Sequence, residues 1–236
     1  MNRPASRPAP TVAYDIEVVG YDWNELDEAT RGYLLERGRK KGQLPEEIQQ
    51  RNALVLGLGK VVAISLWNLA EQRGAVLLEG EGGQWAPWPD RTDGAFLFRG
   101  SEREMLAAFW QRVKSYGRLV SFHGRAYDGP VLMLRSAAAG VAPTRNLAGK
   151  PWDGRGHLDL DDVFTFQGSV REHMSLEYWC RRFGVESPKS TLDGSQVDRA
   201  YKAGELERIG DYCLRDARAT AELFQKIEGT LLPLFQ

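Results

Sequence analysis

The sequence predicts an α/β protein in which a mixed sheet is flanked by helices. Runs of β-forming residues are concentrated in the first half of the chain, and helical patterns alternate with short strands after them. A length of 236 residues and a mass of 26.5 kDa suit one sizeable domain of this class. We therefore expect a disordered tail over residues 1–11 and a single domain over residues 12–236.

Composition narrows the functional classes. The chain is 42% hydrophobic and 27% charged and has no apolar run long enough to span a membrane, so we expect a cytoplasmic protein. Its two cysteines, Cys180 and Cys213, lie in helix-like apolar patterns rather than in Cys-x-x-Cys pairs, so we expect neither zinc nor a disulfide framework. A net charge of -1 argues against binding nucleic acid by bulk electrostatics, although bound metal ions can supply positive charge locally.

The first strand carries two acidic residues, Asp15 and Glu17, within the run 14–18. Side chains two positions apart on a strand share a face, so the carboxylates should stand side by side while the apolar residues around them face the other way. Such a close pair repels unless a cation lies between its members, which makes it half of a metal site. Taken alone, the pair also fits an ordinary solvated strand face.

A long polar segment, residues 20–59, follows this strand. Apolar residues over 26–34 have helical spacing, and Pro45 opens a second helix that could end at Gly57. We expect these residues to form a helical insertion.

The chain then returns to strands. The runs 61–69 and 74–78 predict a hairpin, residues 80–93 a loop, and residues 95–98 a short further strand. A capping box that starts at Ser101 precedes an apolar helical face and predicts a helix.

A strand over 118–122 leads into a glycine-containing turn and a helix that begins near Pro130. In α/β proteins this arrangement places functional side chains at the carboxyl edge of the sheet. Asp128 lies at that edge, although an ordinary turn residue is the simpler interpretation of Asp128 alone.

The last third of the chain is mainly helical. A loop over 142–156 precedes a short strand over 157–160. Ser175 is placed to cap a helix over 176–183, which Gly184 ends.

The final helix, expected over 205–227, carries Tyr212 and Asp216 four positions apart and therefore on one face. Asp216 interrupts an apolar stretch, where an unpaired carboxylate would be costly. Together with the acidic residues noted above, Asp216 makes four carboxylates. Two-metal phosphodiester chemistry requires hard oxygen ligands of this kind around Mg²⁺ or Mn²⁺. The candidate ligands are Asp15, Glu17, Asp128 and Asp216.

Three segments, 15–17, 121–130 and 211–220, resemble the three exonuclease motifs of the DEDD superfamily, tyrosine subtype. The chain is most similar to stand-alone predicted 3′→5′ exonucleases related to the proofreading domain of family B DNA polymerases, over residues 12–227. This resemblance implies a ribonuclease H-like (DnaQ-like exonuclease) fold, with a five-stranded mixed sheet flanked by helices and two divalent cations.

The resemblance also implies roles for the motif residues. Asp15 would bridge both metals, Asp216 would complete the site of the nucleophile-activating metal, and Asp128 would hold the second metal. Glu17 would bind a metal and help to fix the 3′-terminal nucleotide. Tyr212 would orient water or phosphate, because a tyrosine with an ordinary pKa near ~10 is a poor general base at neutral pH.

One residue departs from the family pattern. His123 stands before Gly124, where the family usually has Asn, and either residue could contact substrate or order the turn. Asp159 also resembles a recurrent family feature, with a supporting rather than a ligating role.

We therefore expect a metal-dependent 3′→5′ exonuclease that acts on single-stranded 3′ ends, with DNA as the expected substrate, and releases nucleoside 5′-monophosphates. Two alternatives stay open: an RNA-directed exonuclease, or a catalytically inactive nucleic-acid-binding module on the same fold. The insertion over 20–59 is expected to wall one side of the substrate channel.

Overall fold

The computed structural model describes residues 10–50, 52–89, 91–150, 154, 156–188, 192 and 194–235. Residues 1–9 of the expected tail lie outside the described residues. The expected loop over 142–156 is described in part, and its described residues contain turns and bends but no helix or strand.

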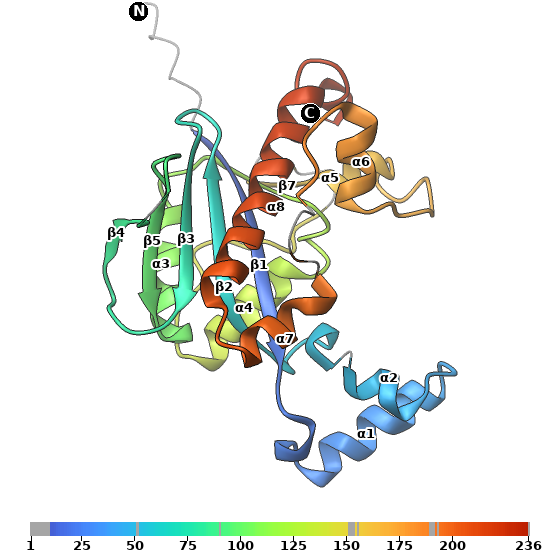
Figure 1. Ribbon diagram of the computed structural model, residues 1–236. Coiled ribbons are helices and arrows are strands. Elements are labelled where there is room, and N and C mark those ends of the chain that lie inside the picture. Colours follow the sequence, from blue (N-terminus) through green and yellow to red (C-terminus); the bar gives the residue numbers. More distant parts are fainter. Residues whose placement is uncertain are drawn as a thin grey trace, which may run out of the picture.

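A mixed sheet forms the centre of the molecule (Figure 1), which confirms the predicted fold class. The strand order in the described residues is β4-β5-β3-β2-β1-β6-β7. The strands are β1 (Thr11–Gly20), β2 (Gly59–Asn68), β3 (Arg73–Glu79), β4 (Trp85–Pro87), β5 (Phe96–Gly100), β6 (Arg118–Ser121) and β7 (His157–Asp159). β1 pairs antiparallel with β2 and parallel with β6, so it is an interior strand.

The sheet in the described residues has seven strands rather than the expected five. β5 and β4 extend the sheet beyond β3; β5, which the sequence predicted as a short strand over 95–98, runs parallel to β3, and β4 antiparallel to β5. β4 lies inside the stretch 80–93 that the sequence predicted to be a loop. Three residues are too few to show an alternating pattern. β4 is fixed instead by its pairing with β5, and the ring of Trp85 packs on the ring of Phe98 in β5, with 5.4 Å between the ring centroids.

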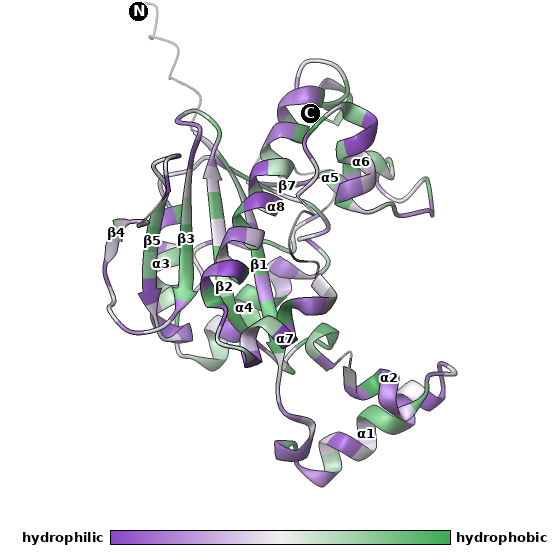
Figure 2. Ribbon diagram, viewed as in Figure 1, coloured by the Kyte–Doolittle hydropathy of each residue, from purple (hydrophilic) through white to green (hydrophobic). Residues whose placement is uncertain are grey.

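Helices cover both faces of the sheet (Figure 1). α3 (Glu102–Val113) and α4 (Asp128–Ala138) pack on one face, and α8 (Leu206–Ile227) crosses the other. α5 (Leu160–Phe164), α6 (Leu176–Phe183) and α7 (Val197–Lys202) lie on the side of α8. The hydropathy colouring shows apolar strands and an α8 with mixed polar and apolar faces (Figure 2), as expected for a helix that covers a sheet.

The alternation of β1 distributes its side chains between two hydrophobic clusters. Val12, Tyr14 and Ile16 belong to the cluster under α3 and α4. Ala13 and Val19 belong to the cluster under α8. This division confirms that Asp15 and Glu17 face away from Tyr14 and Ile16, and it directs both carboxylates toward α8.

Local capping signals in the sequence proved reliable. Ser101 forms the predicted capping box of α3 with Glu104. The Ser175 hydroxyl accepts a hydrogen bond from the backbone of Tyr178 at the start of α6, and Gly184 ends that helix with a left-handed φ of 65°. α8 ends at Ile227, as predicted.

Several boundaries differ from expectation. α4 begins at Asp128 rather than near Pro130, so Asp128 belongs to its first turn. The insertion is helical, with α1 (Glu28–Arg39) and α2 (Pro45–Gln50), but α2 stops before a short 3-10 turn and does not reach Gly57. α5 and α7 were not expected, because helices of five and six residues are too short for a periodic pattern.

In Figure 1, α1 and α2 project away from the sheet. Within the described part of the chain, every helix is too short or too polar to cross a membrane.

Candidate functional site

Asp15 and Glu17 lie in the middle of β1, opposite Ser65 and Ala63 of β2. The register shifts directly after Glu17, where the pairing skips one residue of β2. Glu17 is only 8% exposed, and Asp15 is partly buried. Both carboxylates therefore stand in the layer between the sheet and α8.

A polar contact fixes α8 beside Asp15. The Ser65 hydroxyl donates to the Cys213 carbonyl at 2.8 Å, and the Cys213 thiol donates to the Asp15 carbonyl at 3.4 Å. Sequence reasoning treated Cys213 as an ordinary core residue and gave Ser65 no role. The available signal was a serine within an otherwise apolar strand.

α8 brings Tyr212 and Asp216 to the two carboxylates of β1. Tyr212 is buried at 7% exposure, and Asp216 is partly buried one turn later. Burial is the largest cause that raises the pKa of Asp15 and of Glu17, and the negative charge of nearby Asp216 is the next.

Asp128 reaches the same group from the first turn of α4. Its carboxylate accepts a hydrogen bond from the backbone of Ile16, between the two acidic residues of β1. Gly124 leaves room for it, because a Cβ at that position would lie 2.6 Å from Ser121 Cβ and 3.2 Å from Asp128 Oδ2. The fold thus gathers all four predicted carboxylates and Tyr212 from three separate segments.

The electrostatics of this group are unfavourable without a cation. Burial, followed by the charges of the neighbouring carboxylates, raises the pKa of Asp15 and of Glu17 well above its ordinary value. Burial raises the pKa of Asp128 to about 7. A positive ion among these oxygens would remove the repulsion.

The donor set fits a hard divalent cation. Asp15 Oδ2 is buried and has no hydrogen-bond partner in the described part of the molecule, which is costly for a carboxylate. The Cys213 sulfur lies within 4.8 Å of ligand atoms of Asp15 and Glu17, but burial raises the pKa of its thiol well above normal. A protonated thiol is a poor ligand, so carboxylate oxygens remain, which is the chemistry that Mg²⁺ and Mn²⁺ prefer.

The Tyr212 hydroxyl is held in its protonated form. Burial, then the charge of Asp216, raises the pKa of this phenol far above its normal value. Tyr212 is therefore suited to donate a hydrogen bond rather than to remove a proton.

The turn before Asp128 is organised by Asp159. Its carboxylate accepts the backbone N–H groups of His123 at 2.7 Å, Arg125 at 2.8 Å and Asp161 at 3.0 Å. Burial nonetheless raises the pKa of Asp159 to about 6. Asp159 thus supports the turn through three hydrogen bonds.

His123 occupies the left-handed region, with a φ of 60°. Asn and His tolerate this conformation better than most residues, so either residue can form the turn. The His123 side chain is exposed and its Nδ1 contacts Asp161 Oδ2 at 2.9 Å. His173 contacts the same oxygen at 2.8 Å. Sequence reasoning missed Asp161 and His173.

The sequence analysis also missed a hydrogen-bonded cluster around His157, which involves Tyr14 on the face of the sheet that α3 and α4 cover. His157 Nδ1 donates to the Leu147 carbonyl at 2.7 Å, and its Nε2 lies 2.9 Å from the Ser121 hydroxyl and 3.2 Å from the Tyr14 hydroxyl. Burial lowers the pKa of His157 to about 4. The neutral imidazole therefore joins β1, β6 and β7 below the carboxylates.

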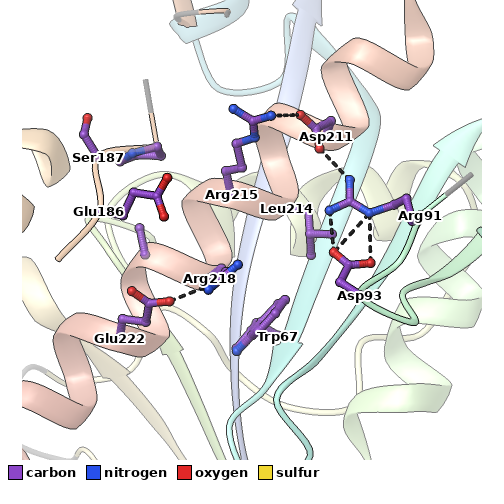
Figure 3. A pocket seen from close by; sticks show the side chains of 12 residues that line it. Trp67, Arg91, Asp93, Glu186, Ser187, Asp211, Leu214, Arg215, Arg218 and Glu222 are labelled. Carbon is purple, nitrogen blue, oxygen red and sulfur yellow. Dashed lines mark hydrogen bonds and ion pairs between the residues drawn. The ribbon is translucent and has the colours of Figure 1, made fainter. Parts of the chain in front are cut away.

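A pocket of about 300 Å³ lies on another side of α8 (Figure 3). None of the four carboxylates is among its described lining residues. Its basic side chains are paired with acidic ones: Arg91 and Arg215 contact Asp211, and Arg218 contacts Glu222 (Figure 3). This pairing makes the pocket a poor site for an anion.

Comparison with known families identifies the family of this chain. The family described as "Predicted 3'-5' exonuclease related to the exonuclease domain of PolB" matches residues 55–231. The match includes Asp128, Tyr212 and Asp216 and begins after Asp15 and Glu17, which the insertion separates from the rest of the chain.

Two curated relatives are DNA polymerases. Those from Pyrococcus glycovorans and Desulfurococcus sp. (strain Tok) are each 27% identical to the chain, over 141 and 140 residues. Each match covers 52% of this chain and 18% of the relative, so the chain corresponds to a small part of those proteins. The family B DNA polymerase of Pyrobaculum calidifontis has a similar structure, with a TM-score of 0.59, 20% identity, and coverage of 99% of this chain and 26% of that one. At this identity the likeness shows the fold alone.

Proposed function

Because the chain belongs to the predicted 3′-5′ exonucleases related to the exonuclease domain of PolB, we propose that it hydrolyses single-stranded nucleic acid from the 3′ end in a metal-dependent reaction. One observation carries the proposal. Four carboxylates from β1, α4 and α8 gather in one group, in which burial and then the charges of the neighbouring carboxylates raise the pKa of Asp15 and of Glu17, with a protonated tyrosine beside them. Such an arrangement is costly unless it holds cations.

Two divalent cations, Mg²⁺ or Mn²⁺, are the proposed cofactors, and their ligands would be Asp15, Glu17, Asp128 and Asp216. Bound divalent ions supply a hydroxide nucleophile and neutralise the charge that develops on the scissile phosphate. The carboxylates bind only when ionised, and their mutual repulsion then favours cation binding over an empty site.

The protein's own groups would position the substrate. Tyr212 keeps its proton and is placed next to Asp216, so it would donate a hydrogen bond to the attacking water or to a phosphate oxygen. Ser65 and Cys213 would keep α8, and with it Tyr212, at a fixed distance from Asp15. Products would be nucleoside 5′-monophosphates.

DNA is the proposed substrate, because the relatives from Pyrococcus glycovorans and Desulfurococcus sp. are DNA polymerases. RNA is the alternative substrate, and the assay below must compare the two, since discrimination between RNA and DNA depends on contacts to the 2′-hydroxyl.

The insertion would border the substrate. The Tyr127 hydroxyl, next to Asp128, donates to the Ala53 carbonyl at the end of the insertion at 2.7 Å. Replacing residues 26–50 with a short Gly/Ser linker should weaken oligonucleotide binding without unfolding the sheet. An unchanged affinity in a fluorescence anisotropy titration would remove this role.

The decisive experiment is a gel assay of 5′-labelled single-stranded DNA and RNA with Mg²⁺ or Mn²⁺. The wild type should give a metal-dependent ladder that shortens from the 3′ end, and the Asp15→Asn/Asp216→Asn variant should not. Asp211→Asn is the matched control, because Asp211 lies on α8 in the pocket of Figure 3 and should be dispensable for cleavage.

Circular dichroism of all three proteins would establish that they are folded. Wild-type turnover in the double variant, or no cleavage of either substrate by folded wild-type protein, would contradict the proposal. The latter result would favour an inactive binding module.

A further inference from the structure

Two of the three histidines in the chain converge on one carboxylate outside the site described above. We propose that His123, Asp161 and His173 form a second metal site, which binds one transition-metal ion such as Zn²⁺ or Co²⁺. This inference is independent of nuclease activity.

The geometry already brings the ligand atoms together. His123 Nδ1 and His173 Nδ1 lie 2.9 and 2.8 Å from Asp161 Oδ2, and all three ligand atoms are within 4.8 Å of one another. Ligand atoms around a four-coordinate Zn²⁺, bonded at about 2.0–2.2 Å, are separated by roughly 3.3 Å. The three ligand atoms are therefore already near the spacing that a bound ion requires.

One ligand is fixed and two can adjust. The Asp161 side chain is 6% exposed. Asp161 lies in the first turn of α5, and its backbone N–H donates a hydrogen bond to the Asp159 carboxylate. The side chains of His123 and His173 are 52% and 54% exposed. Exposure leaves the remaining coordination positions open to water and gives the ion a path of entry.

The donor types select the metal. Two imidazoles and one carboxylate suit Zn²⁺, Co²⁺ or Ni²⁺, whereas Mg²⁺ prefers oxygen ligands and retains its water. The carboxylate site and the histidine cluster should therefore differ in selectivity. The sequence-based expectation of no zinc came from cysteine spacing alone, and neither cysteine belongs to this cluster of two histidines and one aspartate.

Protons compete with the ion. Without metal, each Nδ1 can donate its hydrogen to Asp161 Oδ2. On binding, each imidazole would present the Nδ1 lone pair to the metal and carry a single proton on Nε2, which faces away from the ion.

A bound ion would join three segments of the chain. His123 lies in the turn that leads to Asp128, and Asp161 lies in α5. His173 lies two residues before Ser175, which caps α6. The ion would thus hold the entry to α6 against the turn that supplies a carboxylate to the candidate active site.

The test is a Zn²⁺ titration followed by ¹⁵N NMR of the histidine side chains. The protein would be the full chain with Asp15→Asn/Asp216→Asn, which weakens metal binding at the carboxylates. Nδ1 of His123 and of His173 should shift together and saturate at one equivalent. His157 is the internal control, because both of its ring nitrogens are engaged elsewhere.

A second experiment measures Zn²⁺ affinity by calorimetry in His173→Gln, with Glu172→Gln as the matched exposed neighbour. Removing one ligand should weaken this site at least about 10- to 100-fold, the range seen when even outer-shell partners are lost. Glu172→Gln should bind as the parent does. Unchanged His123 and His173 signals at saturating Zn²⁺, or equal affinity in His173→Gln, would overturn the proposal.

Discussion

Replacing His157 with Asn should remove one contribution that lowers the stability of the protein as pH falls. The imidazole is hydrogen-bonded on both sides, to Leu147 and to the hydroxyls of Ser121 and Tyr14. Burial holds its pKa at about 4, below the ordinary 6.5. Asn can still donate to the Leu147 carbonyl but cannot titrate and has no second ring nitrogen.

The sign and size follow from proton linkage. Between pH 6.5 and 4 the unfolded chain protonates His157 while the folded protein does not, so this group lowers the unfolding free energy as pH falls. One pKa unit corresponds to about 1.4 kcal/mol, which gives roughly 2 kcal/mol between pH 7 and pH 5. Because the residue retains some solvent contact, about 1–2 kcal/mol is expected.

Urea unfolding at pH 7 and pH 5, in the presence of a chelator, measures this difference. His157→Asn should have a lower unfolding free energy than wild type at pH 7. This difference in unfolding free energy should be smaller at pH 5, by about 1–2 kcal/mol. Tyr14→Phe is the control, because it removes one hydroxyl partner and keeps the imidazole, so its difference from wild type should not shrink in this way. A difference in unfolding free energy between wild type and His157→Asn that stays constant or grows toward pH 5 would refute the reasoning.

Three further substitutions test the support of the site. Gly124→Ala should destabilise the protein by about 1–3 kcal/mol in urea unfolding and weaken Mn²⁺ binding in calorimetry, because the added Cβ would press on Ser121 and approach Asp128; unchanged values would show that the turn relaxes freely. Ser65→Ala should cost about 1–2 kcal/mol by the same unfolding assay and lower kcat in the gel assay, since α8 loses its hydrogen bond to β2; full activity would mean that packing alone positions α8. Ser101→Ala should lower stability by about 1 kcal/mol and leave cleavage unchanged, because it removes only the cap of α3; reduced cleavage would argue against that separation.

Patterns local in the sequence were sufficient to predict how several residues of the candidate site lie within their elements. Alternation places Asp15 and Glu17 on one face of β1, and helical spacing places Tyr212 and Asp216 together on α8. Capping chemistry fixed the start of α3. Each of these inferences depends on residues within one element.

The rest depends on how distant segments meet. β5 joins the sheet through parallel pairing with β3, and no local pattern specifies that partner. Likewise, the convergence of His123 and His173 on Asp161 depends on the course of two turns. The contact between Tyr14 and His157 spans most of the chain, and the sequence signals it only as two separate polar residues in strands.

The position of the insertion has a consequence for how this domain can diversify. It joins the ends of β1 and β2, beyond the paired residues Gly20 and Gly59, while pairing with β2 holds Asp15 and Glu17 in register. Loop-closure entropy grows slowly with length, by about 0.6 kcal/mol per doubling. The connection can therefore lengthen, shorten or exchange its contents at little thermodynamic cost, which makes it a suitable point for grafting a reporter or a targeting module without moving the acidic residues.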